Sequence, residues 1–175
     1  MELGQGFITD TIKRLLYYKS LGDKTFEQLT DADFLFQPAG ESNSIAVIIQ
    51  HLHGNMLSRW TDFLTTDGEK EWRLRDAEFT ETILSKHDLL KLWEAGWNCF
   101  VGALQSLQPV DLTKQVTIRS EALYVYDAII RQTAHYPYHV GQIVYLGRLI
   151  KNENWQNLSI PKGESQQFNA KMQGK

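Results

Sequence analysis

The chain has 175 residues and a mass of 20.2 kDa, with 42% hydrophobic and 22% charged residues. This length fits one domain, which can bury roughly 70% of its unfolded surface in a single core. Cys99 is the one cysteine, so a disulfide framework is excluded. The net charge of −3 and the lack of a basic block argue against a nucleic-acid partner.

The hydropathy pattern of the sequence predicts no association with a membrane. The first residues lack the basic start and apolar run of a signal peptide. The apolar stretches fall far short of the about 20 residues that span a bilayer. We therefore expect a cytoplasmic protein with no membrane partner.

Four stretches carry the periodicity of an amphipathic helix. Their apolar residues recur three or four positions apart over 3–22, 44–65, 86–107 and 120–150. Serines suited to N-caps stand before the last three of them: Ser42 or Ser44, Ser85 and Ser120. Gly22 is a suitable stop signal for the first helix. The fourth is apolar on nearly all sides, so we expect it to be the most buried.

The connections differ in character. Within 23–43, Thr30 is placed to cap a short helical turn. Residues 67–84 are highly charged and aperiodic, which predicts a long exposed loop. Residues 115–119 alternate apolar and polar side chains, as in a brief strand.

These elements predict an all-α four-helix bundle over about 3–151. The polar residues 152–175 are expected to form an irregular tail on the surface. The whole chain, 1–175, is then a single domain.

Two histidines, His135 and His139, form an HxxxH motif within the fourth predicted helix. Positions i and i+4 lie about 40° apart around a helix and roughly 6 Å apart along it, so both imidazoles can reach one metal ion. Catalytic zinc usually has three protein ligands and an open position. The third can come from His51 or His53 on the second helix. Two hydrogen-bonded core histidines are the alternative.

Helical periodicity alone favours His53 as the third ligand. The centre of the apolar stripe of residues 45–63 lies roughly 70° from His53 and roughly 130° from His51 at 100° per residue. A ligand at the edge of the stripe would instead suit a pocket that solvent can reach.

The pattern AVIIQHL at 46–52, followed by HYPYHVGQI at 135–143, resembles the DinB superfamily. Its members are four-helix bundles in which a histidine on the second helix and an HxxxH on the fourth bind a divalent metal. A more detailed similarity, at 43–70 and 158–165, is to a branch of unknown function within that superfamily. The resemblance covers essentially the whole chain. It implies His51, His135 and His139 as ligands of a divalent metal, with zinc or nickel the foremost candidates.

DinB-like relatives include bacillithiol transferases and mycothiol-dependent isomerases. The resemblance therefore implies a metal-dependent thiol S-transferase that joins a low-molecular-weight thiol to small electrophiles, and a homodimer. A metal-dependent hydrolase is one alternative. A non-enzymatic metal-binding stress protein with a structural ion and a pure interaction module are others. This chain departs from the common pattern at Pro137, inside HxxxH, and at Val140, where many relatives carry arginine.

Several other side chains are candidates for roles near the metal. Asn55, one turn beyond His51, can orient a metal-bound water, or it is an exposed helix residue. Tyr136 and Tyr138 flank the histidines and can donate hydrogen bonds or simply pack. A charged group either lines a substrate mouth or forms a solvated, salt-bridged surface: Arg59, Asp62, Arg73, Arg75 and Asp76.

Two reactive side chains are expected to take no part. Cys99 stands among aromatic and aliphatic residues and is read as an inert core residue. His87 stands near the start of the third helix and is expected to be solvated.

Overall fold

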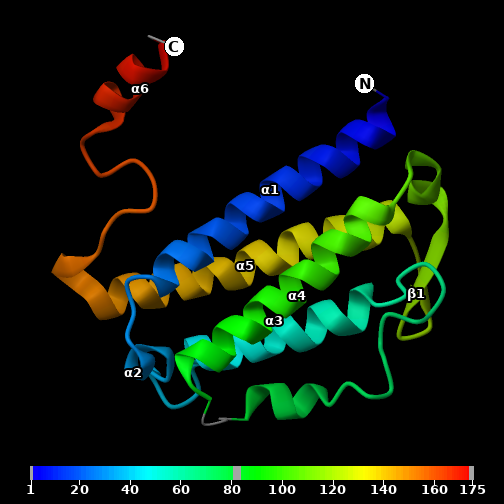
Figure 1. Ribbon diagram of the computed structural model, residues 1–175, viewed down its shortest axis with the longest axis horizontal. Coiled ribbons are helices and arrows are strands. Elements are labelled where there is room, and N and C mark those ends of the chain that lie inside the picture. The colour runs from blue at the N-terminus through cyan, green and yellow to red at the C-terminus, as the bar shows by residue number, and fades with distance from the viewer. Residues whose placement is uncertain (1, 81–83, 174–175) are drawn as a thin grey trace.

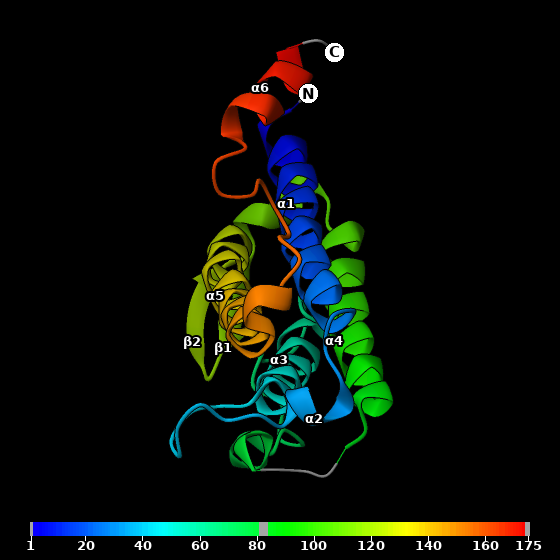
Figure 2. The ribbon, with the colours of Figure 1, turned by 90° about the vertical axis from the view of Figure 1, so that its left-hand side faces the viewer.

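The computed structural model describes residues 2–80 and 84–173. Its frame is four long helices that lie side by side, α1 (Leu3–Phe26), α3 (Ile45–Trp60), α4 (Lys86–Ser106) and α5 (Val125–Lys151) (Figures 1 and 2). Helix α3 packs against α4 and α5, and α1 packs against the same two helices. The fold is therefore mostly helical, as predicted. No helix within these described residues is long and apolar enough to cross a membrane.

Serine caps fix two helix starts where the sequence predicts them. The Ser44 side chain accepts a hydrogen bond from the Val47 amide, and Ser85 accepts one from the Asp88 amide. Helix α4 consequently matches its predicted range to within one residue at its C-terminal end.

Two predicted helix ends are wrong. Helix α1 continues through Gly22 to Phe26, because Gly22 makes room for the Trp93 ring: a Cβ there would lie 2.7 Å from it. Helix α3 ends at Trp60 rather than near 65, because Asp62 takes a left-handed conformation (φ 49°).

The predicted exposed loop at 67–84 is more ordered than its composition indicated. It contains the 3-10 helix η1 (Arg75–Phe79), which packs against α3, and Arg73 is buried. Residues 81–83 lie outside the described part of the chain. Earlier in the chain, Thr30 precedes the short helix α2 (Asp31–Phe34), as predicted, and its amide donates to the Asp33 carboxylate.

A small antiparallel hairpin precedes α5. Strand β1 (Gln115–Ile118) confirms the predicted strand and pairs with β2 (Glu121–Tyr124), which the sequence analysis assigned to the helix. Ser120 is therefore not a helix cap. It forms the two-residue hairpin turn with Arg119, both with positive φ (55° and 63°), as type I′ turns require. The all-α prediction is broadly confirmed, since this two-stranded sheet is small beside the helices.

The remaining short elements follow the long helices. The 3-10 helix η2 (Pro109–Thr113) links α4 to β1, and η3 (Asn152–Asn154) follows α5. The tail is not wholly irregular, since it ends in helix α6 (Ser165–Gln173), which Figure 1 shows apart from the four long helices.

The most buried long helix is α3, not α5 as predicted. Most α3 residues are buried, whereas α5 exposes aromatic side chains such as Tyr138 and Tyr145. Four buried α3 residues are polar: His51, Asn55, Ser58 and Arg59. Buried polar groups must find partners, so α3 is where a functional site is expected.

Candidate metal centre

Three histidines from two helices meet at one point. His51 comes from α3, and His135 and His139 come from α5. The Nε2 atom of His135 lies 3.4 Å from Nε2 of His51 and 3.1 Å from Nε2 of His139. The ligand atoms of the three rings all lie within 4.8 Å of one another, close enough to hold one metal ion.

Each ring is oriented by an oxygen at its other nitrogen. Nδ1 of His51 lies 3.0 Å from a Glu78 carboxylate oxygen. Nδ1 of His135 lies 3.2 Å from Oε1 of Gln132, and Nδ1 of His139 lies 2.8 Å from Oε1 of Gln142. Because these oxygens only accept, each ring donates from Nδ1, which leaves Nε2 of a neutral ring with its lone pair free.

This tautomer pattern leaves all three Nε2 atoms available to a metal ion. The 3.1 Å and 3.4 Å contacts then join bare nitrogen lone pairs, which repel one another unless a positive ion lies between them. Tetrahedral zinc with Zn–N bonds of about 2.0–2.1 Å places its ligand nitrogens about 3.3 Å apart. Two of the three nitrogen pairs have this spacing, and all three ligand atoms lie within 4.8 Å of one another, so the rings can hold one divalent ion.

The environment keeps two of the rings neutral. Burial, reinforced by His139, His51 and Arg131, lowers the pKa of His135 to about 3. Burial likewise lowers the pKa of His139. Neutral imidazole is the form that binds metals, so both side chains are ready ligands near neutral pH.

Glu78 is itself held firmly in place. Arg73 donates to both of its oxygens, from Nε at 2.7 Å and from Nη2 at 2.9 Å. Burial opposes the charge on Glu78, but the hydrogen bonds from His51 and Arg73 outweigh it and hold its pKa below the ordinary value. Gly54, one turn beyond His51, leaves the space that the carboxylate occupies, because a Cβ there would overlap it.

His53, the residue that periodicity favoured, lies outside the cluster. It is half-buried near Gly96 of α4, and burial lowers its pKa. Because α3 is buried on nearly every side, the centre of its apolar stripe does not mark the direction of the metal site.

The histidines open into a pocket of about 400 Å³ between α3, α5 and η1. Asn55 lines it and is buried, not exposed, and its Oδ1 accepts a hydrogen bond from the Tyr136 hydroxyl at 3.1 Å. Tyr136 in turn accepts one from the Trp60 indole at 2.9 Å. Burial raises the pKa of Tyr136, so it stays protonated and keeps Asn55 oriented toward the pocket.

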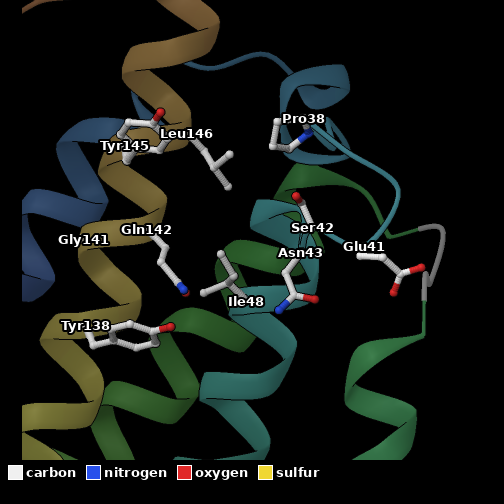
Figure 3. Close-up of a pocket in the computed structure, with 10 residues that line it drawn as sticks. All are labelled: Pro38, Glu41, Ser42, Asn43, Ile48, Tyr138, Gly141, Gln142, Tyr145 and Leu146. Atoms are coloured by element: carbon white, nitrogen blue, oxygen red, sulfur yellow. The ribbon is translucent and has the colours of Figure 1, made fainter.

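A second pocket of about 540 Å³ lies on the other side of Tyr138, which lines both. Figure 3 shows Tyr138 and Gln142 of α5 facing Ile48 of α3 across it, with Ser42 and Asn43 nearby. Gln142 is the partner of His139, so the second pocket reaches the cluster through that hydrogen bond.

The charged residues predicted to line a substrate mouth or to form a solvated surface divide into two groups. Arg59, Arg73 and Arg75 line the histidine pocket, and the first two are buried, which excludes a solvated surface for them. Asp62 and Asp76 are exposed and are not among the lining residues of that pocket.

Cys99 and His87 lie away from the cluster. Cys99 is half-buried, with its sulfur 3.7 Å from the Thr61 hydroxyl. His87 is exposed, as predicted.

The three residues that orient the rings were not predicted from the sequence. Gln132 precedes His135 by three positions and Gln142 follows His139 by three, a spacing that places side chains together on one helix face. That spacing was a usable signal. No such pattern marked Glu78, because it stands 27 residues from His51 in a segment of high charge.

Fold and site together define the class: a mostly helical protein with a three-histidine cluster that can hold a metal ion. The chain belongs to the family described as a protein of unknown function (DUF1572), whose match spans residues 2–164. No curated protein and no solved structure gave a match.

Proposed function

We propose that the protein is a DinB-like four-helix bundle that binds one divalent metal ion through His51, His135 and His139. The observation that carries this is the meeting of three Nε2 lone pairs at 3.1 Å and 3.4 Å, each ring fixed by an acceptor at Nδ1. Zinc and nickel both suit imidazole ligands, and we propose one of them as the natural ion.

We propose further that the site is catalytic. Three protein ligands leave a coordination position open, and the pocket of about 400 Å³ gives a small molecule access to it. A divalent ion there supplies a Lewis acid that lowers the pKa of a coordinated thiol or water. A closed structural ion, as in a metal-binding stress protein, would not need such a pocket.

The proposed reaction is thiol S-transfer to a small electrophile. A low-molecular-weight thiol is the first substrate, in keeping with the DinB resemblance. Two pockets share Tyr138, and His139 lines one of them while Gln142 lines the other, which supports two substrates: one for the thiol and one for the electrophile. Gln142 lines the second pocket and contacts His139, so a substrate in that pocket would lie close to the cluster.

Hydrolysis is the second candidate, because one observation favours it. Asn55 lines the histidine pocket and is held by the Tyr136 hydroxyl at 3.1 Å, so its side-chain amide is free to position a water molecule. A hydrolase would need only one of the two pockets.

The same proposal covers the setting of the protein. It acts on a small molecule in the cytoplasm, where low-molecular-weight thiols stay reduced, and it forms a homodimer. Exposed aromatic side chains on α5, such as Tyr145, provide apolar surface for a second copy. A monomer in analytical ultracentrifugation at micromolar concentration would contradict the dimer.

Cobalt substitution separates the two reactions. The protein is loaded with Co²⁺, and thiols such as cysteine or glutathione are titrated into it. A thiolate-to-cobalt charge-transfer band, abolished by His135→Ala, supports the transferase. Absence of that band with every thiol, together with turnover of ester or amide substrates, favours the hydrolase.

A further inference from the structure

The histidine pocket is lined by five arginines and, among the described residues, by no carboxylate: Arg59, Arg73, Arg75, Arg119 and Arg131. The whole chain carries a net charge of −3. A positive pocket in a negatively charged protein needs an explanation, because clustered like charges destabilise a fold unless something compensates them.

Two of the five arginines are explained by the fold. Arg73 is buried and paired with Glu78, which orients His51. Arg59 is buried, donates to the Gly68 carbonyl and pairs with Glu69 at 2.9 Å. Both guanidinium groups are engaged in holding the loop against α3.

The other three are exposed at the pocket mouth, and we call Arg75, Arg119 and Arg131 the mouth arginines. Arg131 makes no hydrogen bond or ion pair with the described part of the chain. The carboxylate contact of Arg75 is with Asp76, at 3.8 Å, and because Asp76 is fully exposed this ion pair contributes little to stability.

Arg119 shares its one carboxylate with two other guanidinium groups. Its Nε lies 3.0 Å from Oε2 of Glu69, the same oxygen that contacts Arg59 and, at 3.7 Å, Arg73. One carboxylate therefore serves three guanidinium groups, which leaves an excess of positive charge at the mouth.

Separate elements hold each mouth arginine toward the histidines. Arg131 precedes His135 by four positions on α5, so the two lie on one face. The Arg75 guanidinium lies 5.2 Å from the centre of the Phe79 ring, which packs 4.9 Å from the His51 ring.

The hairpin turn fixes Arg119 in the same way. Asp67 accepts hydrogen bonds at 2.8 Å from the amides of both turn residues, Arg119 and Ser120. A strained turn with positive φ is thus held by a loop carboxylate, and it places a cation beside the pocket.

We propose that the mouth arginines bind an anionic group of the substrate, a carboxylate or a phosphate, while its reactive end lies at the histidine cluster. Guanidinium groups match both anions geometrically. This inference deepens the proposed function, since it names the chemical class of substrate for that site.

The test is calorimetric titration of the full-length protein, with and without zinc, using malonate and inorganic phosphate as probes. Malonamide, which is neutral and of similar shape, is the ligand control. The variants are Arg131→Gln and the pair Arg75→Gln with Arg131→Gln. Arg148→Gln, an exposed arginine on the same helix away from the pocket, is the matched control. Zinc affinity is measured on every sample.

We expect saturable binding of malonate or phosphate, at least tenfold weaker in the double variant and unchanged in Arg148→Gln, with zinc affinity retained throughout. The inference would be overturned if the wild type and the double variant bound the anions equally well, or if malonamide bound as tightly as malonate. It would also be overturned if anion binding were lost when zinc is removed. Failure of the wild type to bind zinc would instead count against the metal centre, and arginine-dependent anion binding would still be measured in the zinc-free protein.

Discussion

Nδ1 of His51 lies 3.0 Å from Oε2 of Glu78, although 27 residues separate them in the chain. The contact joins a helix residue to a 3-10 turn that composition alone presents as solvent-exposed loop. A carboxylate that accepts from a histidine fixes the tautomer and orientation of the ring and makes its other nitrogen a better metal ligand. Arg73 holds the carboxylate from the far side, so the ring orientation is set before any metal binds.

Replacing Glu78 with glutamine should weaken metal binding about 10- to 100-fold, since losses of that size follow removal of a hydrogen-bond partner behind a metal ligand. Metal titration against a competing chelator measures it. Glu71→Gln, an exposed carboxylate in the same segment, is the control and should bind like the wild type. Equal affinities in the two variants would show that Glu78 does not support His51.

Gly54→Ala should also weaken metal binding, although it touches none of the three histidines. The added methyl group would overlap the Glu78 carboxylate and push it away from His51. Gly102→Ala on α4 is the matched control, because a Cβ there meets nothing within 4 Å. It should leave metal binding intact and stabilise the helix by up to about 1 kcal/mol. Unchanged metal affinity in Gly54→Ala would mean that Glu78 finds another position.

The two α3 histidines should respond in opposite ways. His51→Ala removes one of the three converging nitrogens and should abolish tight binding, whereas His53→Ala should leave it nearly intact. Metal titration of both variants decides the matter. Loss of binding in the His53 variant with retention in the His51 variant would assign the third ligand to His53.

The metal-free protein should lose stability as the pH falls below about 6.5. The pKa of His135 is lowered to about 3 in the fold, so between these values the unfolded chain binds a proton that the folded chain does not. From pH 7.5 to 5.0 this should cost about 1 kcal/mol after allowance for solvent screening. Urea unfolding of the wild type and His135→Gln at both pH values measures it. Equal losses of stability in the wild type and in His135→Gln would contradict a neutral His135.

Much of the fold was predictable from local signals, because caps and apolar periodicity act within a few residues. Ser85 marked the start of α4, and Thr30 marked the start of α2. Strand β2 was missed because the apolar residues before Val125 continue the helical pattern. Only the positive φ values at Arg119 and Ser120 turn the chain back, and Asp67, 52 residues away from Arg119, supports that turn.

The site was predictable only where its residues share a helix. The HxxxH spacing placed His135 and His139 together, whereas the choice of His51 over His53 came from resemblance and not from periodicity. Arg73 was assigned either to a substrate mouth or to a solvated surface, and Glu78 was not singled out within the predicted exposed loop at 67–84. Each neutralises the other, so both can be buried, and a single sequence does not show that such a pair forms.

The central claim is that three histidines hold one divalent metal ion. Elemental analysis of the purified wild-type protein, beside His51→Ala, His135→Ala and His139→Ala, tests it most directly. We expect close to one equivalent of zinc or nickel per chain in the wild type and little in each variant, with helical circular dichroism retained. A wild type that binds no divalent ion even after incubation with zinc and nickel, or variants that keep a full equivalent, would contradict it.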